Sequence, residues 1–124
     1  MTVLIVDDSV YMRAVIRTVL IKEGHKIIGE AKNGEQAIDM AIELEPELIT
    51  LDNVLPDMLG IDILRSIQDE HLNSKVVMVS AVGNTEMREK AKSLGAHEYV
   101  VKPFEPGQLV KALNTMITRV GAYA

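Results

Sequence analysis

The chain has 124 residues, 48% of them apolar, with a formal net charge of −5 and no cysteine. This length and apolar share fit a single domain over residues 1–124, and the negative charge argues against nucleic acid as a partner. The lack of cysteine excludes disulfides and fits a reducing, cytoplasmic location. No apolar run approaches the roughly 20 residues that span a bilayer, so we expect no membrane insertion.

The first half of the chain predicts a strand, helix, strand, helix and strand at residues 3–6, 10–23, 26–31, 33–44 and 48–51. The first of these strands is apolar throughout and rich in β-branched residues, which is typical of a strand buried on both faces. Gly24 is a natural end for the first helix, and Asn33 with Gln36 resembles a capping box at the start of the second. Pro46 prevents that second helix from continuing.

The second half predicts a helix, strand, helix, strand and helix at residues 61–67, 75–79, 84–94, 98–101 and from 106 onward. The helix over 84–94 is the least apolar, so we expect it to be the least firmly packed. Pro106 opens the last helix. The apolar residues of that helix, expected on its inner face, are Leu109, Val110, Leu113, Met116, Ile117 and Val120.

Five short strands that alternate with five helices predict an α/β fold, a (βα)5 doubly wound parallel sheet with right-handed crossovers and helices on both faces. In such sheets, functional residues gather beyond the carboxyl ends of the strands. The polar residues found there are Asp7, Asp8, Asp52, Ser80 and Lys102. We therefore expect these side chains to form one site.

The chemistry of this set indicates phosphoryl transfer. Three carboxylates favour a hard cation with oxygen ligands, and Mg²⁺ suits because it takes few protein ligands and keeps several waters. The ammonium of Lys102 suits an anion beside the cation, and the hydroxyl of Ser80 adds a hydrogen-bond donor. A carboxylate placed among these groups is a nucleophile that can form an acyl phosphate.

Four segments, Asp7-Asp8, residues 52–60, Ser80-Ala81 and residues 99–104, resemble the receiver domain of two-component response regulators. The match covers the whole chain and keeps order and spacing, and it is strongest to the stand-alone chemotaxis regulators of that family. The resemblance implies a flavodoxin-like receiver fold with strand order 2-1-3-4-5.

The resemblance also assigns a role to each acidic residue. It implies that Asp52 accepts a phosphoryl group from a phosphohistidine on a histidine kinase. Asp8 and Asp52 would bind Mg²⁺ directly, and Asp7 would bind it through water. The main-chain carbonyl of Val54 would be the third protein ligand.

The remaining motif residues would act as a switch. Lys102 and Ser80 would each contact a phosphoryl oxygen, with help from the backbone N–H of Ala81, and the peptide bond before Pro103 would be cis. Tyr99 would turn inward behind Ser80. That movement would change the surface formed by the helix over 84–94, the strand over 98–101 and the last helix.

An output protein would read this surface, with the flagellar motor switch as a candidate, and the chain would be a monomer or weak dimer. As a switch, it would catalyse only its own phosphorylation and dephosphorylation.

One alternative is a receiver of another two-component pathway, either a phosphorelay or a piece of a larger regulator. A second is a Mg²⁺-dependent phosphohydrolase with an aspartyl-phosphate intermediate, but such an enzyme needs a general acid next to the nucleophile, and Asn53 and Val54 follow Asp52. A third is a flavin-binding domain, in which the Asp7-Asp8 pair would repel the phosphate.

Three residues depart from the family pattern. Val54 and Val82 are expected to flank the path of an attacking water, and neither side chain can orient it by hydrogen bonding. We therefore predict slow hydrolysis of the phosphoaspartate. Leu59 stands before Gly60, where Asp, Asn or Ser is more usual.

Overall fold

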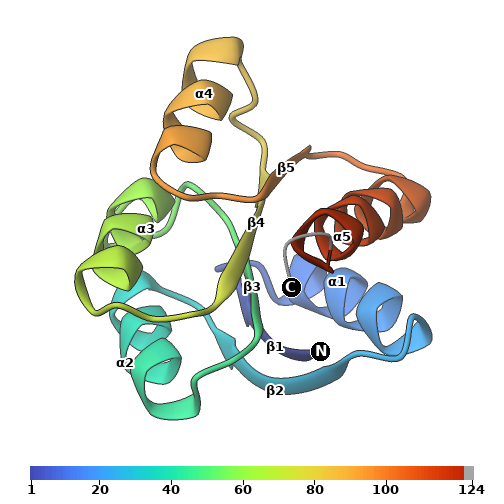
Figure 1. Ribbon diagram of the computed structural model, residues 1–124, viewed down its shortest axis with the longest axis horizontal. Coiled ribbons are helices and arrows are strands. Elements are labelled where there is room, and N and C mark those ends of the chain that lie inside the picture. Colours follow the sequence, from blue (N-terminus) through green and yellow to red (C-terminus); the bar gives the residue numbers. More distant parts are fainter. Residues whose placement is uncertain (122–124) are drawn as a thin grey trace.

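The computed structural model describes residues 1–121 and contains one five-stranded parallel sheet in the order β2-β1-β3-β4-β5 (Figure 1). The strands are β1 Thr2–Val6, β2 Lys26–Ala31, β3 Leu48–Leu51, β4 Lys75–Ser80 and β5 Glu98–Val101. The helices are α1 Val10–Lys22, α2 Gly34–Leu44, α3 Gly60–Asp69, α4 Thr85–Ser93 and α5 Pro106–Gly121. The predicted fold and strand order are confirmed. Within residues 1–121, no helix has the length and apolar character needed to cross a bilayer.

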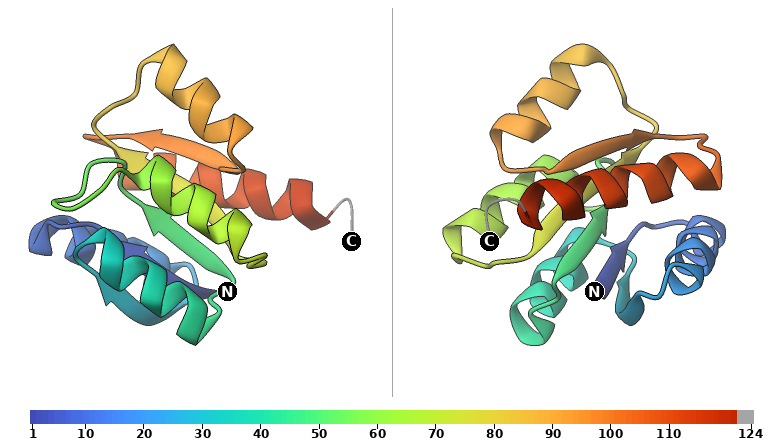
Figure 2. Two further views of the ribbon diagram at one scale, coloured as in Figure 1. Left: turned by 90° about the vertical axis from the view of Figure 1, so that its left-hand side faces the viewer. Right: turned by 45° about the vertical axis from the view of Figure 1, so that its right-hand side comes forward.

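Helices cover both faces of the sheet, α1 and α5 on one side and α2 and α3 on the other (Figures 1 and 2). Alternate residues of β1 supply the two cores. Val3 and Ile5 pack toward α1 and α5, whereas Leu4 and Val6 pack toward α2, α3 and α4. This two-sided burial is why the strands are continuous apolar runs rather than alternating ones.

The caps and ends of the helices follow local sequence closely. The Asn33 side chain accepts the Gln36 N–H of α2 at 2.8 Å, as the sequence predicted. The Gln36 side chain, however, accepts the N–H of Lys32 at 3.1 Å, one residue earlier than in a standard capping box. Leu59, the N-cap of α3, makes no side-chain cap. Gly24, just after α1, has a φ of 86°, a left-handed conformation that glycine adopts without strain.

Which helix faces are buried was harder to predict. In α1 the buried residues are Ile16, Val19 and Leu20, and Val10 and Ile21 are exposed. The expected inner face of α5 is wrong at one position, because Ile117 is 39% exposed, while Leu109, Leu113 and Met116 are buried. The side chain of Val120 lies outside the described residues. Helix α4 buries only Ala91 among its residues, in line with its polar sequence.

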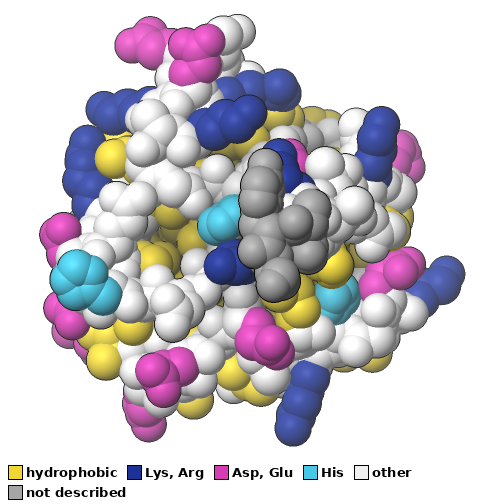
Figure 3. Space-filling view, viewed as in Figure 1, with side chains coloured by type: hydrophobic (Ala, Val, Ile, Leu, Met, Phe, Trp, Pro, Cys, Tyr) yellow, Lys and Arg dark blue, Asp and Glu magenta, His cyan; other side chains and the backbone are white. Residues whose placement is uncertain are grey.

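The surface carries charges of both signs. Figure 3 shows acidic and basic side chains spread over the face seen in Figure 1, with both kinds present around α4. Helix α4 ends with Lys90 and Lys92 in its last turn, where positive charge is favourable next to the helix C-terminus.

Candidate functional site

The carboxyl ends of β1 and β3 bring three carboxylates together. Val6 pairs with Leu51 across these two strands, so the residues that follow, Asp7 and Asp52, lie side by side. Oxygens of Asp7, Asp8 and Asp52 lie within 4.8 Å of one another. Asp7 is 1% exposed and Asp52 7% exposed, whereas Asp8 faces solvent. The predicted acidic cluster is therefore present, with two buried members and an open side.

Local hydrogen bonds hold Asp7 in place. The N–H of Ser9 donates to Asp7 Oδ1 at 2.9 Å, and the Arg13 guanidinium donates to the Asp7 carbonyl oxygen at 2.8 Å. Ser9 is the N-cap of α1, and its hydroxyl accepts the Met12 N–H at 3.1 Å. The start of α1 thus fixes the orientation of the acid that precedes it.

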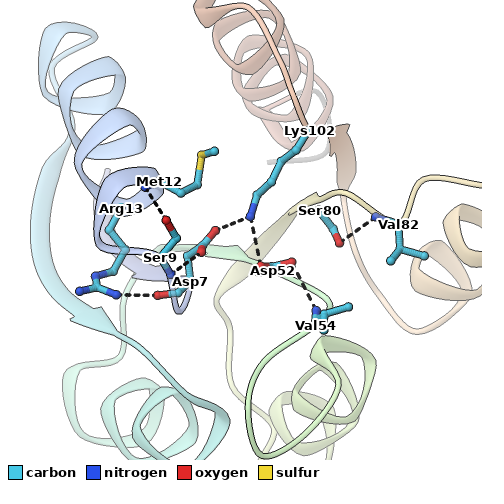
Figure 4. A network of polar contacts seen from close by, with 9 residues as sticks. All are labelled: Asp7, Ser9, Met12, Arg13, Asp52, Val54, Ser80, Val82 and Lys102. Carbon is cyan, nitrogen blue, oxygen red and sulfur yellow. Dashed lines mark hydrogen bonds and ion pairs between the residues drawn. The ribbon is translucent and has the colours of Figure 1, made fainter.

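Lys102 joins the two buried carboxylates, as Figure 4 shows. Its Nζ lies 2.6 Å from Asp7 Oδ2 and 3.1 Å from Asp52 Oδ2, and its side chain is 15% exposed. Burial raises the pKa of Asp7, and the hydrogen bonds from Lys102 and Ser9 offset this only in part. Burial by itself lowers the pKa of Lys102, but its hydrogen bond to Asp7 and the charge of Asp52 outweigh that and raise it.

The charges of this cluster fit a divalent cation. Three carboxylates and one ammonium have formal charges of −3 and +1, a sum of −2. Like charges packed this closely are unfavourable unless a counter-charge neutralises them. The donors are all carboxylate oxygens, which hard cations such as Mg²⁺ prefer. Nearby, the Val54 N–H donates to Asp52 Oδ1 at 3.3 Å, so the loop after β3 contacts the same carboxylate.

Ser80 and Tyr99 form a second group beside Asp52. Ser80 is fully buried, and its hydroxyl accepts the Val82 N–H at 3.3 Å (Figure 4). The Tyr99 hydroxyl donates to the Val82 carbonyl, and Arg88 lies 6.0 Å from the Tyr99 ring centre. Burial raises the pKa of the Tyr99 hydroxyl. Both predicted switch residues thus contact the same turn of the β4–α4 loop.

Comparison with known proteins identifies the family. The model of the response regulator receiver domain matches residues 3–114. The chain belongs to this family. The chemotaxis protein CheY of Thermotoga maritima is 40% identical over 112 residues, which cover 90% of this chain and 93% of that protein. CheY of Bacillus subtilis is 38% identical with the same coverage.

A solved structure agrees with these relatives. A CheX–CheY complex with BeF₃ and Mg²⁺ from Borrelia burgdorferi contains a chain that superposes with a TM-score of 0.91 at 30% identity. The match covers 94% of this chain and 89% of that chain. The likeness therefore extends through the whole sheet and its helices.

The remaining predicted residues of this receiver domain lie around the same edge. The Lys102–Pro103 peptide bond is cis, as the resemblance implied. Ala81 is exposed in the loop after Ser80. Sequence reasoning missed Arg13, which reaches back from α1 and also pairs with Glu30 at 3.4 Å. Arg13 lies in the first turn of α1, six positions after Asp7, and an arginine at such a place is too common to be singled out from sequence.

Proposed function

We propose that this receiver domain is a phosphorylation-dependent signalling switch whose acceptor is Asp52. The observation that carries the proposal is a buried carboxylate with acidic metal-ligand candidates on one side and the Lys102 ammonium 3.1 Å away. Neither feature alone is specific, because buried ion pairs and acidic clusters are common. Their meeting on one carboxylate, at the end of a central strand, is what supports phosphoryl chemistry.

In the proposed reaction, an Asp52 carboxylate oxygen attacks the phosphorus of a phosphohistidine on a kinase partner. The new O–P bond forms as the N–P bond breaks, and the nitrogen keeps its electron pair. Asp7, Asp8, Asp52 and the main-chain carbonyl of Val54 would hold Mg²⁺, whose charge neutralises phosphoryl oxygens. Lys102 already reaches Asp52, so its ammonium can contact a phosphoryl oxygen with little movement.

The switch would work through the Val82 turn. The Ser80 hydroxyl accepts the Val82 N–H, and the Tyr99 hydroxyl donates to the carbonyl of the same residue. If Ser80 turns to donate to a phosphoryl oxygen, Val82 loses one of these two bonds, and the β4–α4 loop and Tyr99 must adjust. The N–H of Ala81 would supply a further donor to the phosphoryl group.

The proposed output surface is α4, β5 and α5. A cleft of about 360 Å³ on this surface is lined by residues of β5 and α5 together with Arg88 of α4. Tyr99 lines the same cleft, so its movement would change the shape seen by a partner.

The pathway we propose is chemotaxis, in the cytoplasm, because the relatives described above are CheY proteins at 38% and 40% identity. A histidine kinase would be the phosphodonor, and the flagellar motor switch is the candidate output target. The catalysis of the chain itself would be limited to its own phosphorylation and slow dephosphorylation.

The test is incubation with Mg²⁺ and acetyl phosphate, followed by intact mass and site mapping. Wild type should gain one phosphoryl group at Asp52, and Asp52→Asn should gain none. Asp39→Asn, which changes an exposed carboxylate of α2, is the matched control and should behave as wild type. With beryllium fluoride as a mimic, amide NMR shifts should appear at Ser80, Tyr99 and α4. A covalent group mapped to any other residue would refute the proposal.

A further inference from the structure

The loop between β3 and α3, residues 53–59, carries the proposed Val54 ligand and is anchored unevenly. At its base, Asn53 is buried, its side chain accepts the Ile61 N–H at 3.2 Å, and its carbonyl accepts the Gly60 N–H at 2.7 Å. Its apolar side chains are divided, because Leu55 is buried in the core whereas Val54 is 51% and Leu59 42% exposed. The Leu59 side chain does not cap α3, and Asn53 supplies the side-chain acceptor for its first turn. Asn53 and Leu55 therefore hold the base of the loop, and the tip beyond Leu55 depends on its own contacts.

Asp57, at the tip of the loop, binds the first turn of α2. Its Oδ1 accepts the Gly34 N–H at 2.7 Å, and its Oδ2 accepts the Glu35 N–H at 3.0 Å. Both carboxylate oxygens are therefore used on a helix 22 or 23 residues away in sequence. The hydrogen bonds from Gly34 and then Glu35 lower the pKa of Asp57. Negative charge is favoured at this end of a helix.

A second contact locks the same position. Met58 lies against Gly34 so closely that a Cβ on this glycine would collide with the Met58 side chain. The first residue of α2 thus has no room for a side chain because the loop rests on it. Asp57 and Met58, two neighbouring residues of the loop, therefore both contact the N-terminus of α2.

The tip is linked rigidly to Val54. The Leu55 N–H donates to the Met58 carbonyl at 3.2 Å, and Val54 forms an isolated antiparallel bridge with Leu59. The turn is therefore a small closed hairpin with Asp57 at its end. A displacement of the tip is passed to Val54 at the base, next to Asp52.

We propose that Asp57 is a positioning residue, which clamps the β3–α3 loop to α2 and so holds the Val54 carbonyl where a cation bound by the acidic cluster can use it. This inference rests on the proposed function, because it needs Mg²⁺ to bind at that cluster. It adds a role for α2, a helix that contributes no side chain to the acidic cluster.

The experiment measures Mg²⁺ affinity by amide NMR titration and the initial rate of phosphorylation by acetyl phosphate as Mg²⁺ is varied. Asp57→Ala should weaken Mg²⁺ binding about tenfold, the lower end of the effect expected when a group that orients a metal ligand is lost. Its phosphorylation rate at saturating Mg²⁺ should equal that of wild type, since Asp57 touches no reacting atom. Asp57→Asn keeps an acceptor oxygen and should fall between Asp57→Ala and wild type.

Two further variants separate positioning from charge and from folding. Asp39→Asn removes an exposed carboxylate from α2, the helix that Asp57 binds, and should leave Mg²⁺ affinity unchanged. Gly34→Ala keeps the Asp57 carboxylate but displaces Met58, and it should weaken Mg²⁺ binding as Asp57→Ala does. Urea unfolding without Mg²⁺ reports any general loss of stability, which alone would not change the Mg²⁺ concentration at half saturation.

The outcomes are distinct. Equal Mg²⁺ affinity in wild type and Asp57→Ala would overturn the clamp while leaving the proposed function intact. An affinity loss in Asp39→Asn equal to that in Asp57→Asn would also overturn it, because bulk charge would then explain the effect. If wild type neither binds Mg²⁺ nor becomes phosphorylated, the proposed function itself fails.

Discussion

Thr50 carries the one buried side-chain polar atom without a hydrogen-bond partner among residues 1–121. It sits in the middle of β3, fully buried, between Ile5 of β1 and Val77 of β4. Valine has nearly the same shape and no hydroxyl. We therefore predict that Thr50→Val stabilises the protein.

The magnitude follows from the unpaired hydroxyl. Burying a polar group without a partner costs about 1–3 kcal/mol, and Thr50→Val removes that penalty without opening a cavity. We expect a gain of about 1–2 kcal/mol in the free energy of unfolding. For a chain of this size the melting temperature rises by about 4 °C per kcal/mol, so the expected increase is about 4–8 °C.

The assay is urea unfolding of wild type and variant, supported by thermal melting. The two midpoints are compared after checking that the unfolding free energy falls with urea at the same slope in both proteins. Thr18→Val is the control, because Thr18 is exposed and its hydroxyl donates to the Ala14 carbonyl at 2.9 Å. That variant should lie within about 0.5 kcal/mol of wild type. A loss of stability in Thr50→Val would refute the reasoning, since it would mean that the hydroxyl has a partner, such as an internal water.

Three other predictions follow from particular residues. Val54→Asn should lose its phosphoryl group faster than wild type after removal of the donor, because an amide can orient the attacking water; slower loss would contradict this. Gly60→Ala should lower the free energy of unfolding by about 2 kcal/mol, because the new Cβ would overlap the Asp52 carbonyl oxygen and lie 2.8 Å from Asn53 Cα. Gly107→Ala should instead raise the free energy of unfolding by about 0.5–1 kcal/mol, because a Cβ at Gly107 would meet nothing within 4 Å beyond its own helix backbone and chain neighbours. Equal changes for Gly60→Ala and Gly107→Ala in urea unfolding would count against the packing argument. Burial lowers the pKa of His97 below 6.5, so the unfolded chain takes up the proton first and stability falls as pH drops through 6.5 toward the lowered value. Urea unfolding at neutral and at mildly acidic pH should show this fall, and His97→Gln should reduce it.

Much of the site could be predicted because it depends on strand ends. An apolar run buried on both faces is visible in the sequence, and so is the polar residue that ends it. Parallel strands place all their carboxyl ends at one edge, so Asp7, Asp52, Ser80 and Lys102 had to be neighbours once the fold class was known. Their exact pairing was not predictable: the bridge from Lys102 to both Asp7 and Asp52 joins residues 95 and 50 positions apart.

Helix faces were less predictable than strands. Helix α1 has apolar residues on several sides, so its periodicity does not select Ile16, Val19 and Leu20 over Val10 and Ile21. The choice depends on where the sheet and α5 lie. Likewise, Ile117 continues the apolar pattern of α5 but lies outside the face of this helix that packs into the core, and it is 39% exposed.

The sequence by itself determined the alternation of strands and helices, the cap at Asn33, and the set of polar residues at the sheet edge. These depend on neighbours within a few positions, where the preferences of each residue act directly. Only the tertiary structure decided that Asp57 would bind the start of α2 and that Thr50 would be left without a partner. Both depend on groups distant in the chain, and the position of such groups is set by packing of the whole sheet rather than by local preference.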